Sequence, residues 1–198
     1  MAEIEAKMFL EFELIAKDRP VNPLLIEVVS STIAGWAGRD AAKMEAHILE
    51  LEALGVKRPA ETPTFYPVSS ARLTQSEIIS CLGTHSSGEV EALFIASEGE
   101  VYVGVSSDHT DREVEAYDVA VSKQICDKPV GKSVWPLSDV IDHWDQLILK
   151  SEIEENGSWT DYQTGTVSEL LSPDMLFKKF GKCGSLPDGT AMLGGTLP

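Results

Sequence analysis

A pair of short apolar runs that flank a tight turn limits the possible folds of this chain more than its other features do. Residues 89–96 and 101–105 have the composition of strands, and Ser97-Glu98-Gly99-Glu100 between them has the composition of a hairpin turn. From Ile78 onward, apolar residues recur with a period of two. The pattern predicts an α+β fold that is rich in β-structure.

The N-terminal part of the chain predicts two strands and one helix. Residues 8–15 alternate apolar and acidic side chains, as in an edge strand, and residues 24–29 are its expected partner across an Asn-Pro turn. A helix is predicted after Gly38, with Asp40 as its cap and an apolar stripe at positions 44, 48 and 51. The proline-rich segment 58–67 then marks a boundary between an N-terminal unit, residues 1–57, and a main domain, residues 58–198.

Three further elements are predicted in the C-terminal half. The Thr110-x-x-Glu113 spacing is that of a capping box, which predicts one helix that continues through Val121. Asn156-Gly157 predicts a second hairpin. Ser172-Pro173 predicts the start of a last helix, and Gly181 its end.

The charge balance limits the possible partners. The chain has 198 residues, 16 Lys plus Arg and 32 Asp plus Glu, so its net charge is -16. Such a surplus repels nucleic acids and anionic lipid surfaces, and neither is expected as a partner. No run reaches the roughly 18–20 apolar residues of a spanning helix, and the N-terminus lacks the pattern of a secretory signal. We therefore expect a cytoplasmic protein.

Three acidic residues at the ends of the predicted hairpin can converge on one point. Glu89 and Glu91 are two residues apart on a strand and leave the same face, while Asp108 follows the return strand. Three carboxylates favour Mg²⁺ or Mn²⁺ over zinc. The alternative is that they form the solvated face of an amphipathic strand in an acidic chain. A site that uses His85 or His109 is a weaker alternative.

A series of motifs resembles the fumarylacetoacetate hydrolase superfamily. The motifs occur in that superfamily's order: Glu89-x-Glu91, Asp108-x-Thr110-x-Arg112, Lys123 before Pro129-x-Gly131, Asn156-Gly157, Gln163-x-Gly165 and Gly195-Thr196-Leu197-Pro198. The similarity covers about residues 35 to 198. Within the superfamily, the chain is most similar to an uncharacterised bacterial family, the domain of unknown function 2848, through its Gly38-Arg39-Asp40 and Ser107–Arg112 strings.

The resemblance implies a fold and a set of site residues. The fold is a rolled mixed β-sheet of the fumarylacetoacetate hydrolase type, in a homodimer. Glu89, Glu91 and Asp108 match the metal-binding carboxylates, and Lys123 matches the lysine that approaches the substrate. Thr196 and Gln163 match substrate-binding positions, and His47 with Glu50 match a catalytic H-x-x-E pair.

The implied activity is cleavage of a C–C bond with Mg²⁺ or Mn²⁺ as cofactor. The substrate would be a small oxo acid or dicarbonyl compound, cleaved by hydrolysis of an acylpyruvate or by decarboxylation of a 2-oxo acid. Lys123 would stabilise negative charge on the substrate oxygens. The alternatives are a non-catalytic metal- or ligand-binding protein on the same scaffold and a cupin-like barrel, although the H-x-H pair of a cupin is absent.

Three departures from the superfamily pattern are visible. The superfamily continues past its G-T-P motif for another strand or two, whereas this sequence ends at Pro198. We therefore expect the main domain to lack its last strands. Ser87 stands where histidine is common, and the spacing from Gly38 to His47 is longer than usual.

Overall fold

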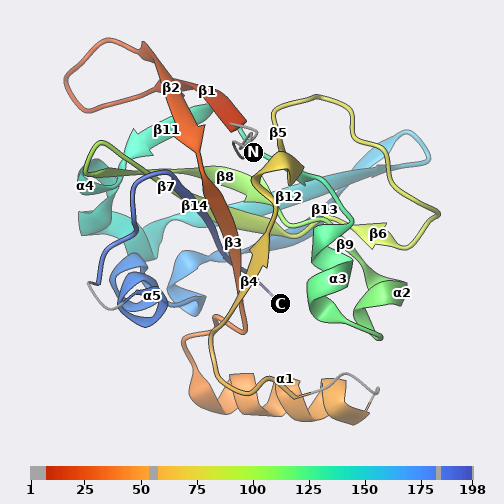
Figure 1. Ribbon diagram of the computed structural model, residues 1–198. Coiled ribbons are helices and arrows are strands. Elements are labelled where there is room, and N and C mark those ends of the chain that lie inside the picture. The colour runs from red at the N-terminus through yellow and green to blue at the C-terminus, as the bar shows by residue number, and fades with distance from the viewer. Residues whose placement is uncertain (1–7, 54–57, 182–183, 198) are drawn as a thin grey trace, which may run out of the picture.

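The protein folds around one curled, mixed sheet of eight strands (Figure 1). The computed structural model describes residues 8–53, 58–181 and 184–197. The strand order is β2-β1-β11-β8-β7-β14-β3-β4, with parallel pairs β1–β11 and β3–β14 and antiparallel pairs elsewhere. The strands are β1 (Met8–Leu14), β2 (Asn22–Val28), β3 (Ser30–Gly35), β4 (Thr64–Val68), β7 (Val90–Ser97), β8 (Glu100–Ser107), β11 (Ser133–Pro136) and β14 (Thr190–Thr196). The expected β-rich α+β fold is confirmed.

Short strands and helices surround this sheet. The smaller strand pairs are β5 (Leu73–Thr74) with β10 (Lys128–Pro129), β6 (Ser86–Ser87) with β9 (Thr110–Asp111), and β12 (Ile148–Glu155) with β13 (Ser158–Thr166). The helices are α1 (Ala41–Ala53), η1 (Ser70–Arg72), α2 (Arg112–Glu115), α3 (Val119–Gln124), α4 (Leu137–Val140), η2 (Ile141–Gln146), η3 (Val167–Glu169) and α5 (Pro173–Phe180). In the described residues, no helix is both long enough and apolar enough to cross a bilayer.

The central hairpin forms as its turn residues predict. β7 and β8 pair from Val90 opposite Ser107 to Ser97 opposite Glu100. Glu98 and Gly99, between them, have φ values of 55° and 78°, the left-handed backbone of the tight hairpin turn that matches strand twist. Asn156 and Gly157 connect β12 and β13 in the same way.

Both faces of β7 are buried, which places this strand at the centre of the fold. Phe94 packs in a core that includes Trp144, Phe177 and Met192. Its neighbours Leu93 and Ile95 point to the opposite face, into a second core that β1 and β2 help to close. The sheet therefore has a hydrophobic core on each face at β7.

The helix predicted from Thr110 through Val121 is wrong in its start and in its continuity. Thr110 lies in β9, and the Asp111 carboxylate caps α2 by accepting hydrogen bonds from the amides of Glu113 and Val114. A second cap, Asp118, starts α3. Because the carboxylates of Asp111 and Asp118 each cap the start of a helix, the segment forms two short helices.

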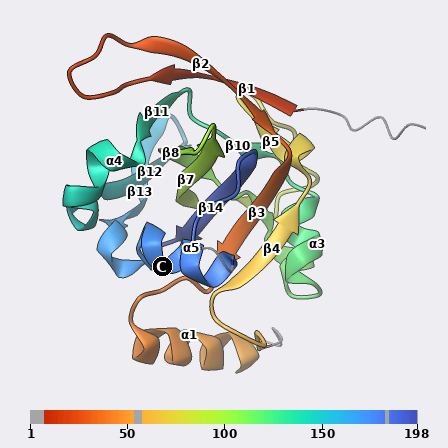
Figure 2. The ribbon, with the colours of Figure 1, turned by 60° about the vertical axis from the view of Figure 1, so that its left-hand side comes forward.

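The N-terminal strands belong to the main sheet. β3 lies between β14 and β4, and β1 pairs with β11, so strands from both sides of residue 57 are neighbours. The division of the chain into an N-terminal unit and a main domain stays a prediction. Helix α1, with Asp40 capping it as predicted, lies across the end of the sheet where β3 ends and β4 begins (Figures 1 and 2).

Candidate metal centre

The β7–β8 hairpin brings three carboxylates together. Its register places Asp108 directly opposite Glu89, and the Asp108 amide donates to the Glu89 carbonyl at 2.8 Å. Glu91 lies two residues further along β7 and shares the face of Glu89. Each of the three offers a carboxylate oxygen, and these oxygens lie within 4.8 Å of one another. The geometry expected from the hairpin is present.

Two of these carboxylates are fully removed from solvent. Asp108 and Glu91 expose 0% and 2% of their surface. Glu91 Oε2 accepts a hydrogen bond of 2.8 Å from the amide of Gly195, which lies in a bulge of β14 at φ 94°. A Cβ atom at that position would lie 2.7 Å from the Cβ atom of Ala37, so glycine is required there.

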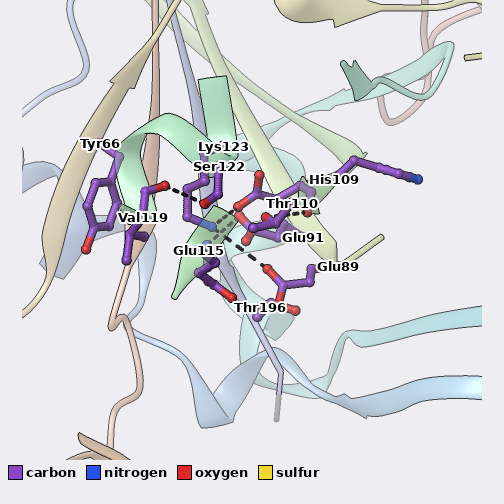
Figure 3. A network of polar contacts seen from close by, with 12 residues as sticks. Tyr66, Glu89, Glu91, His109, Thr110, Glu115, Val119, Ser122, Lys123 and Thr196 are labelled. Atoms are coloured by element: carbon purple, nitrogen blue, oxygen red, sulfur yellow. Dashed lines mark hydrogen bonds and ion pairs between the residues drawn. The ribbon is translucent and has the colours of Figure 1, made fainter. Parts of the chain in front are cut away.

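Two buried lysines face Asp108. Lys123, on α3, forms an ion pair with Asp108 Oδ2. Its amine also lies 3.9 Å from a carboxylate oxygen of Glu89 (Figure 3). Lys128, at the start of β10 and 0% exposed, lies 3.1 Å from Asp108 Oδ1 and donates to the carbonyl of His109. Lys128 was not among the predicted site residues, because its position before Pro129 gives no sign that it is buried.

The two lysines respond differently to their surroundings. Burial alone would lower the pKa of Lys123, but three neighbouring carboxylates outweigh burial and raise it. Burial lowers the pKa of Lys128, because one carboxylate, Asp108, does not compensate for burial and for the repulsion from Lys123. Without a metal ion, the three carboxylates therefore favour the charged form of Lys123.

For the two glutamates of the cluster, burial raises the pKa. Burial, together with the charge of Asp108, raises the pKa of Glu91 well above its ordinary value. Burial also raises the pKa of Glu89, while Lys123 opposes that change. Without a metal ion, the Glu91 carboxyl therefore keeps its proton to a higher pH than an exposed glutamate does.

A cavity of about 1020 Å³ opens beside the carboxylates. Its lining includes Lys123, Gln163 and Thr196. Gln163 donates to the Thr196 hydroxyl at 2.8 Å and accepts from the amide of Val90 at 2.8 Å. These bonds tie β13 and β14 to β7 at the edge of the carboxylate cluster. The roles of Gln163 and Thr196 in substrate binding stay predictions.

Arg112 also lines the cavity. Its guanidinium lies 3.0 Å from both Glu89 and Glu115. Arg112 lies in α2, and its amide donates to the carbonyl of His85. Arg112 was not predicted as a site residue from the sequence, although the D-x-T-x-R spacing contains it.

Of the predicted H-x-x-E pair, the structure describes the side chain of Glu50 only, and Glu50 does not line the cavity. The first turn of α1 lines the cavity, through Lys43 and Met44. Glu50 lies about two turns further along, is exposed, and is not part of the lining. The side chain of His47 lies outside the described part. The catalytic roles of both stay predictions.

The residues present fit a hard divalent cation. All three candidate ligands are carboxylates, the ligand class that Mg²⁺ and Mn²⁺ prefer. Asp108 Oδ1 is buried and accepts no hydrogen bond within the described residues, although it faces the Lys128 amine. Glu89, Glu91 and Asp108 could therefore hold the ion, with Asp108 held in place by the lysines.

The raised pKa of Glu91 predicts how the stability of the metal-free protein depends on pH. A carboxyl whose pKa is higher in the folded chain than in the unfolded chain binds more protons when folded. The free energy of unfolding should therefore fall as pH rises from about 4.5 to the raised pKa, by about 1.4 kcal/mol for each pH unit in that interval. Urea unfolding between pH 5 and 8 with chelator, compared with Glu91→Gln, measures this effect. A profile identical in the two proteins would contradict the prediction.

Comparison with solved structures identifies the class of fold. A structure described as "Crystal structures of Cg1458" matches at TM-score 0.62 and 15% identity, over 86% of this chain and 66% of that one. The apo form of 2-keto-3-deoxy-D-arabinonate dehydratase matches at TM-score 0.63 and 14% identity, over 92% and 67%. A complex of that dehydratase with magnesium and 2,5-dioxopentanoate matches at TM-score 0.58 and 15% identity, over 85% and 62%. The chain spans about two thirds of these proteins.

The fold is therefore a curled mixed sheet of the fumarylacetoacetate hydrolase type, as the motifs indicated. A family model described as "Protein of unknown function (DUF2848)" matches residues 34–198, so the chain belongs to that family. No curated protein sequence matches the chain.

Proposed function

We propose that this protein is an enzyme that uses Mg²⁺ or Mn²⁺ to break a C–C bond in a small 2-oxo acid or 1,3-dicarbonyl compound. The observation that carries the proposal is the cluster of Glu89, Glu91 and Asp108, which lies beside a cavity and beside the buried amine of Lys123. Clustered carboxylates with raised pKa values are costly to bury, and a bound dication offsets that cost. A cytoplasmic homodimer is part of the proposal.

The chemistry divides between the cofactor and the chain. When bound by the three carboxylates, a dication supplies positive charge opposite the negative charge that develops on the substrate oxygens. Lys123, held by its ion pair with Asp108, adds a second positive charge beside the same oxygens. Gln163 and Thr196 form a hydrogen-bonded wall at the edge of the same cavity, where they can orient the substrate.

The bond that breaks can be a C–C bond or a C–O bond. The dehydratase solved with magnesium and 2,5-dioxopentanoate has this fold and supports a 2-oxo acid as substrate. Loss of water is therefore a second candidate reaction. Hydrolysis, decarboxylation and dehydration all place negative charge on the same oxo-acid oxygens, so they would use the same cluster and lysine.

Metal binding is the first test of the proposal. At a metal concentration about 100 times the dissociation constant, we expect Mg²⁺ or Mn²⁺ to raise the melting temperature of the wild type by about 5–10 °C. Glu89→Gln should abolish most of this shift, because it removes one ligand charge. Glu154→Gln, at an exposed position on β12, is the matched control and should keep the full shift.

Two results would count against the proposal. Equal metal-dependent shifts in Glu89→Gln and Glu154→Gln would place the ion elsewhere. If metal binds at the cluster but no acylpyruvate, oxaloacetate or 3-deoxy-2-oxo acid is turned over, the protein is a binding protein rather than an enzyme of this class.

A further inference from the structure

Trp36 has an unusual backbone conformation beside the cavity. Its φ is 58°, in the left-handed region that bulky residues rarely occupy. The residue follows directly after β3 and lines the cavity. Such a conformation persists only where the surrounding structure holds it in place.

The segment around Trp36 is held from two sides. The Ala37 carbonyl accepts a hydrogen bond of 2.8 Å from the Leu171 amide, and the Arg39 amide donates to the Glu169 carbonyl at 2.8 Å. On the other side, the β14 bulge at Gly195 lies in close contact with Ala37. The indole of Trp36 is therefore carried by a fixed piece of backbone.

Tyr66 completes a rigid aromatic pair with Trp36. The indole Nε1 of Trp36 donates to the Tyr66 hydroxyl at 3.1 Å. A Cβ atom at Gly35 would lie 2.6 Å from the Tyr66 ring, so glycine at this position lets the ring lie against the backbone. Figure 3 shows Tyr66 and Val119 on one side of the carboxylate–lysine cluster.

Apolar side chains predominate on this side of the cavity, although Lys43 also lines it, and Arg39 and Asp40 are engaged in other contacts. Met44, Val119 and Leu170 contribute to the lining with the aromatic pair. Arg39 forms a two-bond ion pair with Asp145, and the Asp40 carboxylate caps α1. At about 1020 Å³, the cavity is far larger than the oxo-acid group that the carboxylate cluster would bind.

We infer that Trp36 and Tyr66 form a specificity-determining wall for an aromatic or branched apolar group at the far end of the substrate. The preferred substrate class is then a 2-oxo acid or acylpyruvate with such a tail, rather than a short or hydroxylated acid. The inference rests on the proposed function, because the cluster and Lys123 would hold the other end of the molecule.

The test compares ligands that share a head group and differ in their tails. With saturating Mg²⁺, isothermal titration should show 4-phenyl-2-oxobutanoate binding at least about tenfold more tightly than 2-oxobutanoate or 2-oxoglutarate. Trp36→Ala should reduce this preference at least about fivefold while leaving 2-oxobutanoate affinity unchanged. Trp36→Phe should give an intermediate preference. Trp159→Ala, at a largely exposed tryptophan outside the cavity lining, should match the wild type.

Several results would overturn the inference. These are a wild-type preference below about threefold, tighter binding of 2-oxoglutarate than of the phenyl acid, and an equal loss for both ligands in Trp36→Ala. A Mg²⁺ titration without organic ligand separates this failure from that of the proposed function. If Mg²⁺ does not bind, the proposed function fails, and 3-phenylpropanoate against propanoate, without metal, tests the aromatic wall alone.

Discussion

Asp108→Asn is expected to destabilise the metal-free protein by about 3–5 kcal/mol, the cost of removing one partner from a buried ion pair. Asp108 faces both Lys123 and Lys128, which are 6% and 0% exposed. Without the charge of Asp108, Lys128 still donates to the backbone carbonyl of His109, but a neutral carbonyl does not balance a buried ammonium whose pKa burial already lowers. Urea unfolding at pH 7 with chelator measures the loss.

The double variant Asp108→Asn/Lys128→Met makes this prediction specific. If an uncompensated buried lysine causes the loss, replacing Lys128 with an apolar residue of similar length should recover part of it. Asp161→Asn, which breaks an exposed pair with Lys150, is the matched control and should change stability far less. An equal loss in Asp161→Asn and Asp108→Asn, or no recovery in the double variant, would contradict the account.

The parts of the fold that depend on local signals are predictable from the sequence. The turn at Glu98-Gly99 determines the register of β7 and β8, and that register places Asp108 opposite Glu89. The carboxylate cluster is thus a consequence of one hairpin. The sequence pattern did not separate α2 from α3. It assigned the helix start to Thr110, whereas the carboxylates of Asp111 and Asp118 cap the two helices.

The parts that depend on distant partners are not predictable in this way. Strand β3 contains Ser31, a residue type that is more typical of turns, but its hydroxyl donates to the Val68 carbonyl of β4 and is satisfied inside the sheet. Its other neighbour, β14, lies about 160 residues away and pairs with it in parallel. The place of Lys128 in the site is not predictable for the same reason, since its partner Asp108 becomes its neighbour only after folding.

Lys123→Met is expected to lower turnover of the protein's 2-oxo acid substrate by about 10²–10³-fold, the usual effect of removing a preorganised charge from an active site. The fold should survive this change, because Asp108 keeps its ion pair with Lys128. Metal binding should also survive, since Lys123 is not a ligand and its loss removes a nearby positive charge. The prediction therefore separates the catalytic role of Lys123 from any structural role.

Oxalate, which resembles the enolate of a 2-oxo acid, gives a readout that does not require the substrate to be known. With Mg²⁺ bound, Lys123→Met should weaken oxalate binding by about the factor that it costs in turnover, because both report interaction with negative charge on the two oxygens. Lys132→Met, at an exposed lysine outside the cavity lining, should leave oxalate affinity unchanged. If Lys123→Met binds Mg²⁺ and oxalate as the wild type does, the amine of Lys123 serves only to balance Asp108, and the charge that stabilises the reacting oxygens comes from another group.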